Sequence, residues 1–184
     1  MARRPIDPQR LDVEAFARDG GTLEGAVPLA LLPRLLEAGH AGQRPGADDA
    51  VRWRAYGEWR RTPGSGPQPW LHLQADAELA LECQRCLGPL PTALQVDRWF
   101  RFAPDEDTAA ALDAEVEEDV LALGRPLDLV ELIEDELLLA LPLVPRHEAC
   151  PEPLLAPDDG AAEVETERPN PFAALEALKR HGGR

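Results

Sequence analysis

Cysteine is scarce in this sequence, and its scarcity limits how the chain could be cross-linked. Only three cysteines occur in 184 residues. An odd number, with two of them three positions apart, is not the pattern of a disulfide framework, which needs an even set of paired cysteines. The three cysteines instead favour a reducing compartment and a role in metal binding or thiol chemistry.

Aromatic residues and long apolar runs are also scarce. Phe, Trp and Tyr make up 5% of the sequence, so the core must be built mainly from Leu, Val and Ala. The run LLLALPLVP is far shorter than the roughly 20 residues that a membrane-spanning helix needs. The opening MARRPIDPQR lacks the apolar segment of a secretory signal peptide. We therefore expect a soluble, cytoplasmic protein.

Positive charge is scarce in the second half of the chain. The net charge is −15, and residues 105–165 hold 19 Asp and Glu residues against two arginines. This balance disfavours a protein that coats nucleic acid, because that affinity rests largely on neutralising phosphates. The acidic half could attract a basic partner such as a ribosomal protein, or it could simply keep the surface solvated.

The periodicity of the apolar residues predicts an α+β fold. Strict alternation from Leu71 to Cys83 predicts a long strand buried on one face, and Leu94–Phe102 returns as the second strand of a hairpin. Val51–Arg60 alternates in the same way, and Thr22–Val27 is a further short strand. We expect a mostly antiparallel sheet, either open or barrel-like, with helices packed against it.

Three helices are predicted in the first 150 residues. Asp7 and Pro8 suit the N-cap and first position of a helix that would end at Gly20. Leucines line one side of Leu29–Ala38. Leu127–Leu141 is the clearest helix, because apolar residues line one side while its acidic residues share the other, as on a solvated face.

The remaining segments complete the predicted domain organisation. Ala103–Glu115 is expected to be an acidic loop and Val116–Leu123 an edge strand, which closes a core domain of residues 1–150. Residues 151–169 have no periodicity and are predicted to be a flexible acidic linker. Residues 170–184 are predicted to be a short C-terminal docking helix and tail.

The C-terminal segment has the signs of a helix that docks into a groove. A good N-cap and first-position proline are followed by a narrow apolar stripe. The alternative is an inert tail. The candidate partner-docking residues are Asn170, Pro171, Phe172, Leu175 and Leu178.

The strand Val51–Arg60 carries a basic patch. Its arginines are interleaved with Trp53, Tyr56 and Trp59, a combination that single-stranded nucleic acid uses for phosphate contact and base stacking. The alternative is an ordinary half-buried strand with arginines on its solvent face. The candidate RNA-binding residues are Arg52, Arg54, Arg60, Arg61 and Arg85.

Two pairs of residues, each spaced i and i+3, carry the most specific chemistry. Cys83 and Cys86 end the long strand, and His147 and Cys150 follow the clearest helix. Thiolates and imidazoles are the usual ligands of tetrahedral zinc, so the pairs predict a zinc site that ties the hairpin tip to the helix exit. The alternatives are reduced structural cysteines or a thiol-redox pair, although this CxxC does not open a helix as thioredoxin-like motifs do.

Motifs of catalysis are lacking. The sequence contains no nucleophile elbow, no phosphate-binding loop and no dinucleotide fingerprint. We therefore expect a protein that is not an enzyme, with no catalytic residues, no small-molecule substrate and no membrane partner.

Three segments together resemble a known family. They are ECQRCL at 82–87, DLVELIEDELLLALPLVP at 128–145 with His147 and Cys150 beyond it, and NPFAALEALK at 170–179. Their order strongly resembles the bacterial YceD family, the large ribosomal RNA subunit accumulation proteins. Some relatives carry a cysteine-rich segment at the position of His147 and Cys150, which supports zinc.

The resemblance implies a cytoplasmic, non-enzymatic ribosome biogenesis factor. It would support the synthesis, processing or stability of large-subunit (23S) ribosomal RNA, through the RNA itself or through a basic ribosomal or RNA-processing protein. The alternatives from the residues alone are a CxxC thiol-redox protein and a generic acidic chaperone for basic proteins.

Overall fold

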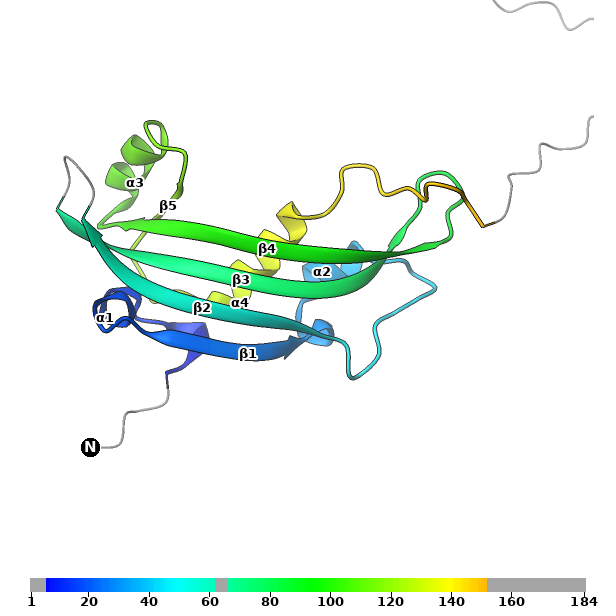
Figure 1. Ribbon diagram of the computed structural model, residues 1–184, viewed down its shortest axis with the longest axis horizontal. Helices are drawn as coiled ribbons and strands as arrows, with labels where there is room; N and C mark the ends of the chain where they lie inside the picture. The colour runs from blue at the N-terminus through cyan, green and yellow to red at the C-terminus, as the bar shows by residue number, and fades with distance from the viewer. Residues whose placement is uncertain (1–5, 62–65, 152–184) are drawn as a thin grey trace, which may run out of the picture. The chain divides into compact units, whose positions relative to one another are not determined.

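The computed structural model describes residues 6–61 and 66–151 (Figure 1). Within these residues, five strands form one open sheet in the order β1-β2-β3-β4-β5. The first four are antiparallel neighbours, and β5 runs parallel to β4. The predicted α+β class and mostly antiparallel sheet are confirmed, and the sheet is open rather than barrel-like. The strands are β1 (Thr22–Pro28), β2 (Ala50–Arg61), β3 (Pro67–Glu82), β4 (Pro89–Ala103) and β5 (Asp119–Ala122).

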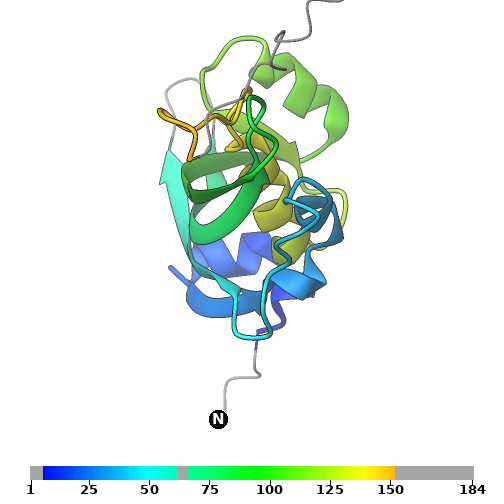
Figure 2. The same ribbon diagram turned by 90° about the vertical axis from the view of Figure 1, so that its right-hand side faces the viewer.

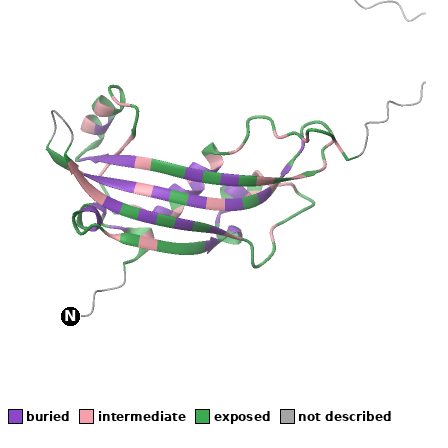
Figure 3. Cartoon of the chain, viewed as in Figure 1, coloured by how far each residue is buried: buried purple, intermediate pink, exposed green. Residues whose placement is uncertain are grey.

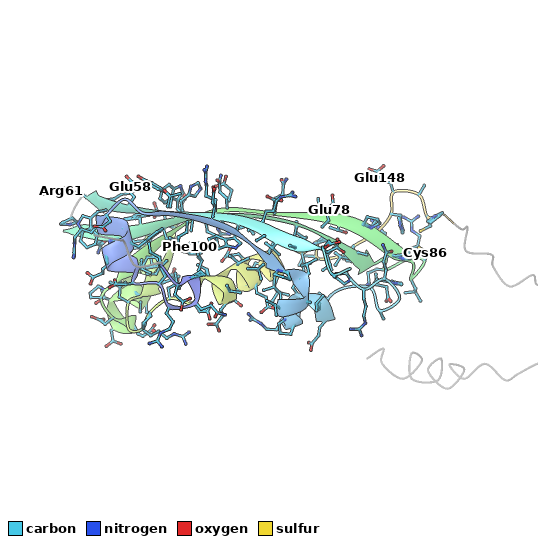
Figure 4. The ribbon with its side chains drawn as sticks, turned by 90° about the horizontal axis from the view of Figure 1, so that it is seen from below. Glu58, Arg61, Glu78, Cys86, Phe100 and Glu148 are labelled. Carbon is cyan, nitrogen blue, oxygen red and sulfur yellow. The ribbon has the colours of Figure 1, made fainter. Side chains whose placement is uncertain are left out.

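The helices gather on one side of the sheet (Figure 4). Among the described residues, none of them is both long and apolar enough to cross a membrane. Two 3-10 turns, η1 (Pro8–Arg10) and η2 (Leu29–Leu31), precede the first two helices. The α-helices are α1 (Val13–Arg18), α2 (Pro33–Glu37), α3 (Glu106–Asp113) and α4 (Leu129–Leu139).

The core lies between the sheet and these helices. Burial alternates along most of β2 and β3 and around Leu94 and Val96 of β4, as the period of the sequence predicted, whereas the last four residues of β4 are all buried (Figure 3). Leu71, Leu73 and Phe100 point to the helical side and are completely or almost completely buried, as are Ile133 and Leu137 of α4. Burying each such side chain contributes about 1.5–3 kcal/mol, so the contact between α4 and the long hairpin is a major source of stability.

Helix α1 approaches the sheet through a glycine. A Cβ atom on Gly57 of β2 would lie 2.6 Å from Cδ1 of Phe16 and 2.9 Å from Cα of Ala17. Only a residue without a side chain allows this contact between helix and strand. The close approach buries Phe16 in the core.

The N-terminal helix begins later than the sequence predicted. Asp7 caps only the turn η1, where it accepts a hydrogen bond from the backbone N of Gln9 at 3.0 Å. Leu11 is then extended, because its backbone pairs with that of Leu127. Asp12 is the N-cap of α1. The helix therefore begins after Asp12 rather than after Asp7, because Asp12 also caps well and Leu11 before it is held in an extended pairing.

Two other expectations about the helices are wrong. The predicted helix Leu29–Ala38 is divided into η2 and α2, since Pro33 begins a new helix. The predicted loop Ala103–Glu115 contains α3, capped by Asp105, which accepts from the backbone N of Thr108 at 2.8 Å. The edge strand expected within residues 116–123 is confirmed as β5.

The acidic side of α4 is not a uniformly solvated face. Glu134 and Glu136 are buried, with 5% and 7% of their surfaces exposed. The carboxylate of Glu134 accepts hydrogen bonds from the backbone N atoms of Arg34 and Leu35, at 2.8 and 3.1 Å. It therefore caps the N-terminus of α2, which lacks a side-chain cap of its own.

Several predicted features lie outside the described residues. The linker beyond residue 151 and the C-terminal docking helix of residues 170–184 are among them. The candidate partner-docking residues Asn170, Pro171, Phe172, Leu175 and Leu178 therefore stay predictions.

Candidate metal centre and open sheet face

The two predicted ligand pairs come from segments that lie side by side at one end of the sheet (Figures 1 and 2). The first segment is the tip of the β3–β4 hairpin, and the second is the chain that leaves α4. The backbone N of Gln84 donates to the carbonyl O of Pro145 at 2.9 Å, and Arg85 Nη2 lies 3.5 Å from the carbonyl O of His147. The main chain therefore already joins the hairpin tip to the helix exit.

All four predicted ligands converge at this junction. The Sγ atoms of Cys83, Cys86 and Cys150 and a ring nitrogen of His147 lie within 4.8 Å of one another. Cys86 Sγ is 3.5 Å from His147 Nδ1, which matches the edge of about 3.5 Å between sulfur and nitrogen ligands of tetrahedral zinc. All three cysteines are free thiols. We name these four side chains the clasp.

The backbone around Cys83 is arranged to hold a thiolate. Burial acts to raise the pKa of Cys83, but the backbone N–H groups of Cys86, His147 and Arg85, with the His147 ring, lower the pKa to about 5. Burial, followed by the neighbouring sulfurs, raises the pKa of Cys150 to about 11. The three cysteine sulfurs lie close together, and few N–H donors are available to stabilise them as thiolates. A cation at their centre would stabilise all three thiolates together.

The hairpin tip includes a residue in the left-handed region. Leu87, which follows the second cysteine, has a φ of 59° and is the only described residue other than glycine with positive φ. Its backbone N donates to the carbonyl O of Cys83 at 2.8 Å, and its own carbonyl O lies 3.2 Å from His40 Nε2. The tight turn that presents the two cysteines is thus retained despite the unfavourable conformation of Leu87.

The donor set fits zinc. Three soft thiolates and one imidazole, with no carboxylate among them, favour zinc over the hard cations that prefer oxygen ligands. Cys83 is completely buried, and the other three ligands are half-buried. A site closed in this way is typical of structural zinc rather than catalytic zinc, which keeps an open coordination position.

The face of the sheet opposite the helices carries the predicted basic patch. Each of three candidate arginines is paired with a carboxylate of its own or the next strand. The pairs of Arg52 and Arg54 are largely exposed to solvent, so each contributes little to stability, whereas the pair of Arg60 is half-buried. In all three pairs the negative partner offsets the local positive charge. The pairs are Arg52 with Asp76 at 2.6 Å, Arg54 with Glu24 at 3.3 Å and Arg60 with Glu58 at 2.8 Å.

The other two candidate arginines lie elsewhere. Arg61 is exposed at the end of β2 (Figure 4). Arg85 lies in the hairpin tip beside the clasp. The five candidate RNA-binding arginines therefore do not form one continuous patch, because the hairpin tip and the end of β2 are at opposite ends of the sheet (Figure 4).

The open face carries only part of the expected aromatic set. Tyr56 lies there as predicted, with its ring centroid 6.5 Å from that of Trp99. Trp53 is buried on the helical side, where it covers Gly25. The open face also carries Trp99 of β4, whose ring stacks on His72 with centroids 4.4 Å apart. The guanidinium carbon of Arg60 lies 3.6 Å from the centroid of Trp99, a cation–π contact. Only the strand register brings these residues together.

Comparison with known proteins gives a consistent family. Residues 71–179 match the family described as "Large ribosomal RNA subunit accumulation protein YceD". The protein of that name from Haemophilus influenzae is 36% identical over 111 residues, which cover 59% of this chain and 63% of the relative. The chain thus spans less than two thirds of that relative. No solved structure matches the chain. The region that matches the family contains most of the long hairpin, the whole of α4 and all four clasp residues, and the chain belongs to the YceD family.

Proposed function

We propose that this protein supports the accumulation of large-subunit ribosomal RNA without catalysing a reaction itself. The observation that carries the proposal is family membership, established over a region that includes every residue of the clasp. The name of the Haemophilus influenzae relative states this role for that protein. The proposal extends it to the present chain.

The clasp supports a structural part in this function. A zinc ion held by Cys83, Cys86, His147 and Cys150 would fix the hairpin tip to the segment that leaves α4. Zinc would supply cross-linking of the two segments, and its binding free energy would add to the stability of the fold. The protein's own contribution is the set of backbone N–H groups that stabilise the Cys83 thiolate.

Burial weakens the alternative of a thiol-redox protein. A redox thiolate must reach its substrate, and the low pKa of Cys83 would suit such a role. Cys83 is completely buried, however, and Cys86 and Cys150 are half-buried. The low pKa therefore fits a metal ligand better than a nucleophile.

The charges favour a basic protein as the direct partner, with an indirect effect on the RNA. The chain carries a net charge of −15, and three of the candidate RNA-binding arginines have carboxylate partners. A surface with matched charges releases few counterions from a polyanion, so it gains little of the usual affinity for RNA. Direct RNA contact through Arg52, Arg54, Arg60, Arg61 and Arg85 is the other outcome of the test.

The test has a cellular and a biochemical part. In cells that lack this chain, we expect the ratio of large- to small-subunit ribosomal RNA to fall and to be restored by the wild-type gene. An unchanged ratio contradicts the proposed function. Salt-dependent retention of labelled ribosomal RNA by the purified protein, weakened by Arg52→Ala with Arg54→Ala, would instead assign direct RNA contact.

A further inference from the structure

A groove separate from the clasp opens where β5 meets the start of α4. It has a volume of about 480 Å³ and is lined by the sheet edge, the loop before α4 and the first residue of α3. This volume falls in the range of sites that bind drug-sized ligands. Figure 1 shows β5 and α3 at one end of the sheet and the hairpin tip that carries the clasp at the other.

The floor and the rim of this groove differ in chemistry. Half-buried Leu121 and Leu127 and the more deeply buried Phe102 supply an apolar floor. The rim contains four carboxylates and a single arginine. They are Glu106, Asp128, Glu131, Asp135 and Arg125.

Two of these carboxylates already have strong partners, and two do not. Asp128 caps α4 by accepting from the backbone N of Val130 at 2.9 Å, and Asp135 pairs with Arg34 at 2.5 Å. Glu131 has only a 3.8 Å contact with exposed Arg125. Glu106 is exposed, and it forms no ion pair within the part of the chain that the structure describes. The negative charge of the rim is therefore not matched, in contrast with the open sheet face.

We propose that this groove binds an extended basic segment of a partner protein. The acidic rim would attract Lys or Arg side chains, while the apolar floor would contact their aliphatic stems and any neighbouring apolar residue. Phosphates would be repelled by the same rim, so nucleic acid is excluded as the occupant. The inference rests on the proposed function, in which a basic protein is the direct partner.

The test uses fluorescence anisotropy with the full-length protein and labelled nonapeptides. The probe is three repeats of Lys-Val-Lys, and three repeats of Lys-Ser-Lys have the same charge without apolar side chains. We expect the valine peptide to bind at least threefold more tightly than the serine peptide. Equal affinities would show that the apolar floor is not used, and the absence of binding by either peptide would overturn the inference.

Paired variants separate the groove from the overall charge. Glu106→Gln with Glu131→Gln removes two charges from the rim, and the control Glu37→Gln with Glu78→Gln removes two exposed charges outside the groove. From the strength of typical exposed ion pairs, the affinity for the valine peptide should fall by about fivefold in the rim variant and by less than twofold in the control. If both variants lost affinity equally, the peptides would be responding to the overall negative charge of the protein rather than to the groove, and the inference would be overturned.

The two proposals can fail separately. The groove is tested on purified protein, whereas the proposed function is tested by ribosomal RNA levels in cells. Normal peptide binding by the rim variant, combined with a loss of large-subunit RNA in cells that lack the chain, would refute the groove alone. An unchanged RNA ratio in those cells would refute the function, whatever the peptides do.

Discussion

Replacing Glu134 by alanine should destabilise the protein far more than replacing its neighbour Asp135. Both side chains pair with Arg34, at 2.9 and 2.5 Å, so a count of ion pairs would treat them alike. They differ in burial, because 7% of the Glu134 side chain is exposed against 46% for Asp135. Only Glu134 also accepts the backbone N–H groups of Arg34 and Leu35.

The magnitude follows from what each substitution leaves behind. Glu134→Ala removes the cap of α2, worth about 1 kcal/mol, and leaves the buried N–H of Leu35 without a partner, at about 1–3 kcal/mol. We therefore expect a loss of about 3 kcal/mol. Asp135→Ala removes one partly exposed pair and should cost less than about 1 kcal/mol.

Thermal and urea unfolding, followed by circular dichroism, would measure both variants. For a domain of this size, about 3 kcal/mol corresponds to a fall in Tm of roughly 6–12 °C. Glu134→Gln, which retains one acceptor oxygen for the two N–H groups, should lie between the two alanine variants. Equal losses for Glu134→Ala and Asp135→Ala would refute the reasoning that burial and capping set the cost.

Two further predictions concern a buried acid and a strained residue. Burial raises the pKa of Glu136 above the ordinary glutamate value of 4.5. Ionisation of Glu136 in the folded protein therefore costs stability as the pH rises above 4.5. Glu136→Gln should therefore stabilise the protein at pH 7 but not at pH 4, and a gain of equal size at both pH values would contradict this. Leu87→Gly should raise stability by about 0.5–1 kcal/mol, because it relieves the left-handed conformation while a side chain that is 63% exposed loses few contacts. A fall in Tm for this variant would show that the Leu87 side chain contributes contacts that outweigh the strain.

The sequence predicted the strands and the convergence of the clasp for a physical reason. Alternation of apolar and polar residues with a period of two indicates which side chains of a strand are buried. This alternation ends at Cys83 and so indicates where the hairpin turns. The clearest helix has its apolar stripe against the same hairpin, so its exit leads to that tip (Figure 1). Both ligand pairs lie at the ends of elements whose apolar faces have to pack together.

Features that depend on register or on distant partners could not be predicted in this way. Glu134 is buried because Arg34, a hundred residues away in sequence, presents the N-terminus of α2 to it. The carboxylate opposite Arg52 is set by the alignment of β2 with β3, which no local pattern specifies. The acidic residues of α3 favour a loop over a helix in the sequence, although Asp105 ahead of an alanine-rich segment is a recognisable cap.

Metal analysis of the purified full-length protein tests the account most directly. We expect close to one zinc per chain, lost in Cys83→Ser and in Cys150→Ser, with a fall in Tm that chelation of the wild type reproduces. Cys83→Ser and Cys150→Ser each remove a ligand from a different segment. Loss of zinc in both variants would therefore establish that zinc joins the hairpin tip to the exit of α4. A metal-free protein with three rapidly reactive thiols and a Tm unaffected by chelator would contradict the account.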